Sequence, residues 1–168
     1  MMLLRNLIAA ITLVLSLAGL ARAQGTEVPF GALQHDASLP IEITADRLEV
    51  DQSNNNAIFR GNVVVGQGEL RLSAGRIEVE YGAESSAYAG AIVKLQASGG
   101  VTFVNGTEAA EADSADYSIT DKTVFMDGSV VLTQGRNALS SDRMVINLDT
   151  GTARLDGRVR TILNTGNP

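Results

Sequence analysis

Apolar and polar side chains alternate along most of the chain after residue 40. The run from Ile41 to Val50 sets the pattern, and residues 57–65 and 70–81 continue it. Successive side chains of a β-strand point to opposite faces, so a spacing of two predicts strands with one buried face. Polar turns separate the runs, at residues 51–56, 120–122 and 149–151. The pattern therefore predicts an all-β chain.

Two signatures recur in a fixed order along these runs. The first is a small or polar corner followed by alternating apolar positions, and it starts at Ala45, Ala74, Ser114 and Ser141. The second is a glycine between two sets of apolar positions, at Gly61, Gly99, Gly128 and Gly157. The corners lie 29, 40 and 27 residues apart, and the glycines 38, 29 and 29 apart. A repeat of about 28 residues, with an insertion of about ten at residues 82–90, accounts for both series.

Each signature has a structural meaning. A glycine in mid-strand weakens pairing unless a bulge, a bend or a close approach of backbones requires it. The corner moves the apolar positions by one residue, which turns the following side chains to the other face. We therefore expect about 15 short antiparallel strands that turn corners with one apolar face kept inward. They could form two sheets facing each other across an apolar interior, or coil as a solenoid.

Two segments fit the repeat less well. Residues 107–115 contain good helix formers, but their place in the repeat predicts a strand. Residues 24–40 lack a clean period. We interpret them as an extended leader whose Phe30 and Leu33 tuck against the first strand, ahead of repeats that span residues 41–163. Pro40 suits the start of an edge strand, where its missing N–H does no harm.

The N-terminus has the features of a secretory signal peptide. Arg5 precedes an apolar or small run from Leu7 to Leu20, and Ala21-Arg22-Ala23 forms a cleavage site. The alternative is an uncleaved membrane anchor, but a run of about 14 residues is short of the ~20 that span a bilayer. We predict that residues 1–23 are removed and that residues 24–168 form a single domain.

Composition narrows the function classes. Without Arg5 and Arg22, 11 Lys and Arg stand against 19 Asp and Glu, a net charge of about −8, which disfavours nucleic-acid binding. The chain has no cysteine, which excludes thiolate metal sites. Its one histidine, His35, lies in the leader, so a Ser/His/Asp arrangement is not expected. Acidic pairs such as Glu78 and Glu80 share an outward strand face. We predict a binding protein without catalytic residues, metal or cofactor.

The order of residues at 41–74 carries a family resemblance. Ile-x-Ile-x-Ala-Asp-x-Leu-x-Val, a polar turn, Ala-x-Phe-x-Gly-Asn-Val-x-Val, Gln-Gly and Leu-x-Leu-x-Ala resemble the OstA-like family, and within it the periplasmic LptA type. The resemblance spans residues 36–163 and departs from the pattern at 82–90 and at Gly75, where the pattern has Asp. The family fold implied is a twisted open antiparallel β-jellyroll, or β-taco.

The resemblance also implies a function. Proteins of this type carry lipopolysaccharide across the periplasm. The implied partners are LptC at the N-terminal edge, the N-terminal domain of LptD at the C-terminal edge, and further copies joined end to end by strand addition. Exposing an acyl chain to water costs about 0.8 kcal/mol per methylene, so a carrier needs a continuous apolar groove.

The inward apolar positions are the candidate lipid-binding residues. The alternatives are a structural or adhesive β-solenoid whose closed core these residues fill, and a secreted carbohydrate-active enzyme with acids and aromatics clustered on one face. The candidate groove residues are Ile43, Leu48, Val50, Phe59, Val63, Val65, Leu72, Ile77, Val79, Val101, Phe103, Met126, Val130, Leu132, Met144, Ile146, Leu155 and Val159.

Overall fold

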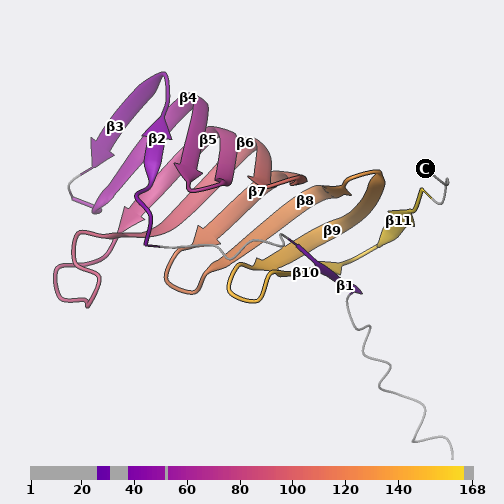
Figure 1. The fold of residues 1–168 in the computed structure, drawn as a ribbon. Coiled ribbons are helices and arrows are strands. Elements are labelled where there is room, and N and C mark those ends of the chain that lie inside the picture. The colour runs from indigo at the N-terminus through magenta and orange to yellow at the C-terminus, as the bar shows by residue number, and fades with distance from the viewer. Residues whose placement is uncertain (1–25, 31–37, 52, 165–168) are drawn as a thin grey trace, which may run out of the picture.

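A computed structural model describes residues 26–30, 38–51 and 53–164 of the chain (Figure 1). The predicted signal peptide, Leu33 and His35 lie outside these residues. The described residues contain strands and no helix, as the alternating pattern predicted. The strands are β1 (Thr26–Pro29), β2 (Glu42–Thr44), β3 (Arg47–Asp51), β4 (Asn56–Gln67), β5 (Leu70–Tyr81), β6 (Ile92–Asn105), β7 (Glu108–Ser118), β8 (Thr123–Gln134), β9 (Asn137–Asn147), β10 (Thr152–Asp156) and β11 (Arg160–Ile162).

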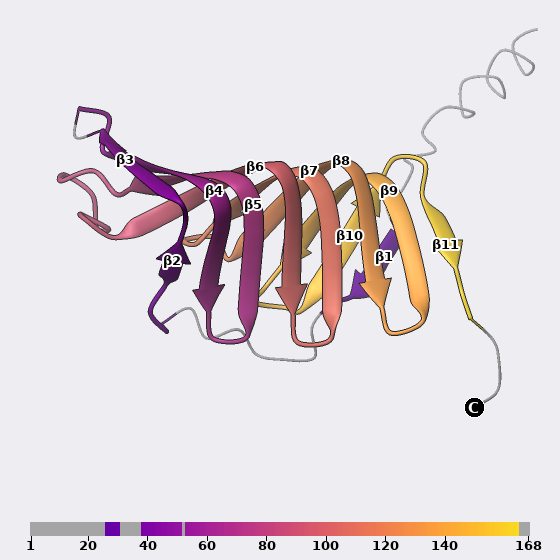
Figure 2. The same ribbon diagram turned by 90° about the horizontal axis from the view of Figure 1, so that it is seen from above.

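The strands form one antiparallel sheet that folds back on itself. Its order is β1-β10-β9-β8-β7-β6-β5-β4-β2, with β3 also paired to β4 and β11 also paired to β9. Strands β4 to β9 arch over near their middle, so that their two halves lie in different layers (Figures 1 and 2). The fold is the open antiparallel β-jellyroll that the family resemblance implied, and not the solenoid that the pattern alone left open.

The two layers can be named from the short strands that they contain. The β10 layer holds β3, β10, β1 and residues 56–60, 76–81, 92–98, 114–118, 123–127 and 143–147 of the long strands. The β11 layer holds β2, β11 and residues 63–67, 70–74, 101–105, 108–112, 130–134 and 137–141. The layers are continuous at the bends. On the opposite side the strands of each layer are joined by turns, at residues 68–69, 106–107 and 135–136 in the β11 layer and at residues 82–91, 119–122 and 148–151 in the β10 layer, and we call this side the mouth.

The repeated glycines lie where the strands bend. Gly61, Gly99, Gly128 and Gly157 all have positive φ, between 76° and 83°. The pairing register shifts between Arg60 and Val63 in β4, and at the matching places of β6 and β8. A bulge was one of the three roles expected for these glycines, and the structure confirms it. It also explains why the described residues form 11 strands and not about 15, because the bulge bends a strand without ending it.

The glycines also meet the corner aspartates of the neighbouring strand. A Cβ atom on Gly61 would overlap the carboxyl group of Asp46, and Gly128 and Gly157 meet Asp113 and Asp142 in the same way. Positive φ and close approach together therefore require glycine at these positions.

Two corners need comment. The third corner is at Ala112 and Asp113, two residues before the predicted Ser114, because Asp113 is the residue that meets Gly128. In the second corner Gly75 replaces the aspartate and lies against Gly99. A Cβ added to Gly75 would lie 3.1 Å from the Gly99 carbonyl oxygen.

Residues 108–118 form β7, between β6 and β8, as the repeat predicted against local helix propensity. Pairing on both sides outweighs the preference of the individual residues. The inward positions Ala110, Ala112 and Ala115 are buried.

The leader departs from the prediction. Its residues 26–29 form β1, which pairs with β10 near the C-terminus and not with the first repeat strand. Phe30 is buried against Phe103 of β6, with ring centroids 6.0 Å apart. The interpretation of Phe30 as packing on the first strand was wrong, because residues 26–29 pair with β10 and the next residue, Phe30, packs on Phe103 in the middle of the sheet.

Candidate functional site

The inward face of the β10 layer carries two apolar rows. Residues directly opposite in antiparallel strands point to the same face. One row runs from Leu48 through Phe59, Ile77, Ala97, Ala115, Met126 and Met144 to Leu155. The other runs from Val50 through Ala57, Val79, Leu95, Tyr117, Val124, Ile146 and Ala153 to Val28.

The β11 layer supplies the facing row. It runs from Ile43 through Val65, Leu72, Phe103, Ala110 and Leu132 to Leu139, where Thr161 of β11 is the next partner. Val63, Val101 and Val130 stand next to the bend and are buried. The interior is thus lined by apolar side chains from one end of the sheet to the other.

The structure divides the predicted groove residues into two groups. Ile43 and Phe59 are half-buried, and Leu48, Val50 and Val159 are exposed. The other thirteen are buried between the layers: Val63, Val65, Leu72, Ile77, Val79, Val101, Phe103, Met126, Val130, Leu132, Met144, Ile146 and Leu155. In the middle of the sheet the interior is filled by the protein's own side chains.

Sequence reasoning missed some interior residues. Leu95, Val124 and Leu139 are buried on the same rows. Leu95 and Val124 stand four residues before a repeat glycine, as Ala57 does, and that spacing could have identified them. Phe30 was expected to pack on the first strand, and nothing in the sequence placed it in the interior, because it lies outside the repeat.

The interior is open at its N-terminal end. Leu48 and Val50 of β3 lie opposite Phe59 and Ala57 and face the same way, yet their side chains are 53% and 64% exposed. Strands β2 and β3 pair with β4 and, within the described residues, with nothing on their other side. Apolar side chains of the interior therefore reach solvent at this edge.

A buried polar pair joins the two layers at the mouth. The Tyr117 hydroxyl of the β10 layer donates a hydrogen bond to Oε1 of Gln67 in the β11 layer, at 3.1 Å. The amide of Gln67 in turn donates to the Leu39 carbonyl, at 3.0 Å. Burial raises the pKa of Tyr117 to about 12, because the phenolate would lose its hydration.

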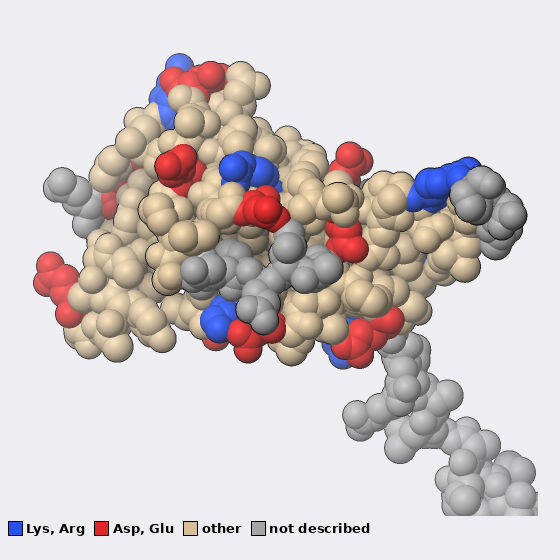
Figure 3. Space-filling model, in the orientation of Figure 1, with Lys and Arg blue, Asp and Glu red and all other residues tan. Residues whose placement is uncertain are grey.

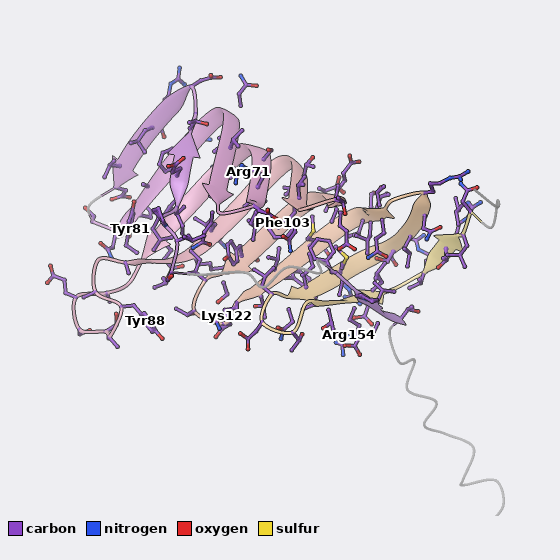
Figure 4. All side chains as sticks on the ribbon, in the orientation of Figure 1. Arg71, Tyr81, Tyr88, Phe103, Lys122 and Arg154 are labelled. Atoms are coloured by element: carbon purple, nitrogen blue, oxygen red, sulfur yellow. The ribbon has the colours of Figure 1, made fainter. Side chains whose placement is uncertain are left out.

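A shallow hollow lies next to this pair. Its volume is about 460 Å³. Tyr88, on the inserted loop between β5 and β6, stands at one side of it and is 53% exposed (Figure 4). The other lining residues are Leu39, Ile41, Gln67, Ala91, Ile92, Ile119 and Thr120. The mouth thus has an apolar surface beside the hydrogen bond between Tyr117 and Gln67.

Charged side chains stay on the outside. Figure 3 shows acidic and basic groups in small separate patches with uncharged surface between them. Several form ion pairs, such as Lys122 in the turn before β8 with Asp149 in the turn before β10, at 2.6 Å. Arg158 donates to Asp142, which holds the pKa of that carboxyl below its usual range. Within the described residues, no three His, Cys, Asp or Glu side chains gather as a metal site would require.

A search of the described residues found no helix of the length and hydropathy needed to cross a membrane.

The comparisons with known proteins agree with this geometry. The family described as LptA/(LptD N-terminal domain) LPS transport protein matches residues 42–152. The chain belongs to this family. An uncharacterized protein of Rhizobium meliloti (strain 1021) is 34% identical over 155 residues, covering 88% of this chain and 83% of the relative.

Two further matches concern LptH of Pseudomonas aeruginosa. Its sequence, named lipopolysaccharide export system protein LptH, is 36% identical over 62 residues, which are 37% of this chain and 35% of that protein. The crystal structure of LptH, described as the LptA-homologous periplasmic component of the lipopolysaccharide transport device, matches with a TM-score of 0.68. That match covers 77% of this chain and 99% of LptH at 17% identity, so it shows a shared fold. The family predicted from residues 41–74 is confirmed.

Proposed function

We propose that this protein is a periplasmic bridge that carries lipopolysaccharide from the inner to the outer membrane, with the acyl chains between its two layers. The observation that supports this most directly is the set of apolar rows that run from the exposed β3 edge to the β10 and β11 end. The mouth is held by side-chain contacts between the layers, and the N-terminal edge is exposed, so a lipid can enter and leave while its phosphorylated head stays in water.

The cargo has to separate the layers to enter. The interior side chains already fill the space between them, and burying one 12-carbon chain gains on the order of 10 kcal/mol at about 0.8 kcal/mol per methylene. That gain offsets the loss of contacts between the two layers. Met126 and Met144 lie side by side on one row, and their flexible side chains can repack around acyl chains of varied position.

The partners follow from the ends of the sheet. An edge strand presents unpaired backbone groups that a strand of another protein can complete. We assign LptC to the edge formed by β2 and β3, the N-terminal domain of LptD to the end formed by β10 and β11, and a second copy of this chain to either end. Residues 1–23 direct export and are removed. The role is transport, without catalysis and without a cofactor.

Photo-crosslinking in cells that make lipopolysaccharide tests this proposal. A photoreactive residue at Met126, which is fully buried on the inward face, should capture lipopolysaccharide. The matched control is the neighbouring Phe125, which faces outward and is 40% exposed, and it should capture none. Phe59 should behave as Met126 does.

The alternative is a structural or adhesive β-solenoid with a closed core. The open sheet argues against it, while the filled interior of the central strands is the one observation in its favour. The solenoid predicts no capture at Met126 or Phe59. That result, with protein present at normal levels, would contradict the carrier proposal.

A further inference from the structure

The two ends of the sheet are finished differently. At the N-terminal end both layers present an edge strand, β3 in one layer and β2 in the other. At the C-terminal end β11 is an edge of its layer, and Ile162 at its end and the following Leu163 are 53% and 64% exposed. In the other layer the edge of β10 is already occupied, because β1 pairs with it. Figure 2 shows β1 beside β10 at this end.

The contact between β1 and β10 is short and joins strands from opposite ends of the chain. It runs from Thr26 opposite Leu155 to Pro29 opposite Thr152. The Phe30 amide continues it by donating to the Gly151 carbonyl at 2.9 Å. The Gln134 amide, in the β11 layer, donates to the Pro29 carbonyl at 2.6 Å. Backbone and side-chain hydrogen bonds thus hold β1 in place without a turn that links it to β10.

Phe30 ties the two layers together. Its backbone follows the β10 layer, but its ring stacks on Phe103 of the β11 layer, with an interplanar angle of 26°. The side chain is 1% exposed. Phe103 stands in the middle of the apolar row, beside Ala110 (Figure 4). Phe30 therefore occupies interior space that the proposed function assigns to acyl chains.

The direction of β1 matches that of β3. Each neighbouring pair on the path from β1 through β10 to β4 and β3 is antiparallel, and the path has an even number of steps, so β1 and β3 run the same way. Val28 of β1 continues the row that begins at Val50 of β3. A second molecule in the same orientation would therefore present β3 to β10 as β1 does now.

We propose that β1 and Phe30 form an internal strand that closes the C-terminal end until β3 of a second copy of this chain replaces β1 on β10. The replacement continues the β10 layer across the contact, and β2 of the second copy adds to β11 in the antiparallel sense. Leu48 and Val50, exposed in the single molecule, become covered. Departure of Phe30 frees the interior space beside Phe103. The inference rests on the proposed function, since it concerns the joint that cargo would cross.

A reversible disulfide tests the proposal in a chain that has no cysteine of its own. Glu27 and Arg154 are register partners on β1 and β10 and are both exposed. Opposite positions in antiparallel strands lie close enough for a disulfide. The double substitution Glu27→Cys and Arg154→Cys therefore fixes β1 on β10 when oxidised. The matched control is Phe125→Cys with Val145→Cys, opposite positions on β8 and β9, where a bond fixes strands that the proposal leaves paired.

The readout is the concentration at which the full-length exported protein associates, measured by light scattering after gel filtration. Oxidation of the β1–β10 pair should raise that concentration by about tenfold or more, and reduction should restore it. Oxidation of the control pair should change nothing. Phe30→Ala should shift association to lower concentration, because β1 then loses its anchor.

Unchanged association of the oxidised β1–β10 variant would overturn the proposal. So would the absence of association in both Phe30→Ala and the reduced variant at the highest concentration reached. Lipopolysaccharide capture at Met126 separates this inference from the proposed function. If lipopolysaccharide is captured at Met126 but association is unchanged by the disulfide, the strand exchange is wrong and the carrier function stands. Association that follows the disulfide without any capture sinks the carrier function and leaves the strand exchange standing.

Discussion

The bend and the mouth hold the same two layers together by different means. At the bend the backbone itself crosses from one layer to the other, and glycine and aspartate of adjacent strands fit against each other, as Gly128 does with Asp113. At the mouth the layers meet through side chains, such as Tyr117 with Gln67 and Phe30 with Phe103. The difference indicates that the bend acts as a fixed spine, while the contacts at the mouth can break and re-form, as the proposed function requires.

The largest expected effect is at the bend. Gly128→Ala should lower the free energy of unfolding by about 3 kcal/mol, because φ is +83° and the new Cβ would overlap the Asp113 carboxyl group. Gly90→Ala is the matched control, since φ there is +72° but no atom lies within 4 Å. It should cost about 1 kcal/mol. Urea unfolding measures both, and equal losses would show that the close approach to Asp113 is unimportant.

The next effect concerns the mouth and depends on pH. The pKa of Tyr117 is raised to about 12 in the folded protein, while an unfolded tyrosine titrates near 10. The Tyr117 hydroxyl therefore holds its proton more tightly in the folded state. Its contribution to the free energy of unfolding is complete below pH 10 and is lost as the pH rises from 10 towards 12. The loss should reach roughly 2 to 3 kcal/mol.

Tyr117→Phe should remove that part of the alkaline loss and cost about 1 kcal/mol at neutral pH through the lost hydrogen bond to Gln67. Tyr88→Phe, on an exposed side chain, should leave the alkaline profile unchanged. Unfolding curves between pH 8 and pH 12 would check this, and identical profiles for wild type and Tyr117→Phe would rule out Tyr117 as the cause.

A smaller effect should appear as coupling at the bend. If the glycine and the aspartate must fit together, Asp113→Ala should relieve part of the damage done by Gly128→Ala. A double-mutant cycle should then give a coupling energy of about 1 kcal/mol in the favourable direction. Additive losses would mean that the positive φ alone accounts for the glycine.

The smallest effect concerns the last bend. Arg158 bonds to Asp142 and lowers its pKa. A carboxyl with a depressed folded pKa stabilises the fold above its unfolded pKa, and this contribution is lost as the pH falls below about 4. Arg158→Met should return the carboxyl pKa of Asp142 to the usual range, as a carbon-detected NMR titration would show. Both groups are at the surface, so the midpoint of thermal unfolding should hardly move.

The sequence was enough to predict the all-β fold, the bulges and the apolar inward face, because each depends on local spacing that repeats. The strand number was overestimated because spacing alone does not show that a strand continues through a bulge, as β4 does at Gly61. The third corner was placed two residues late because Ser114-Ala-Asp116 resembles a corner, whereas contact with Gly128 identifies Asp113.

The interior was harder to predict than the fold. Leu48 and Val50 follow the same alternation as buried residues, and their exposure depends on β3 being the last strand of its layer. The position of Phe30 depends on pairing between residues 26–29 and 152–155, far apart in the chain and outside any repeat. No local pattern carries such information.

The unlike ends of the sheet have a consequence for assembly size. A contact between two different surfaces repeats by the same operation at every step, and unless the rotation brings it back to its start it gives an open polymer. The proposed exchange of β1 for β3 would be such a contact. The protein would then set only the rise per subunit, while the gap between the two membranes and the proteins anchored in them would decide how many subunits a bridge contains.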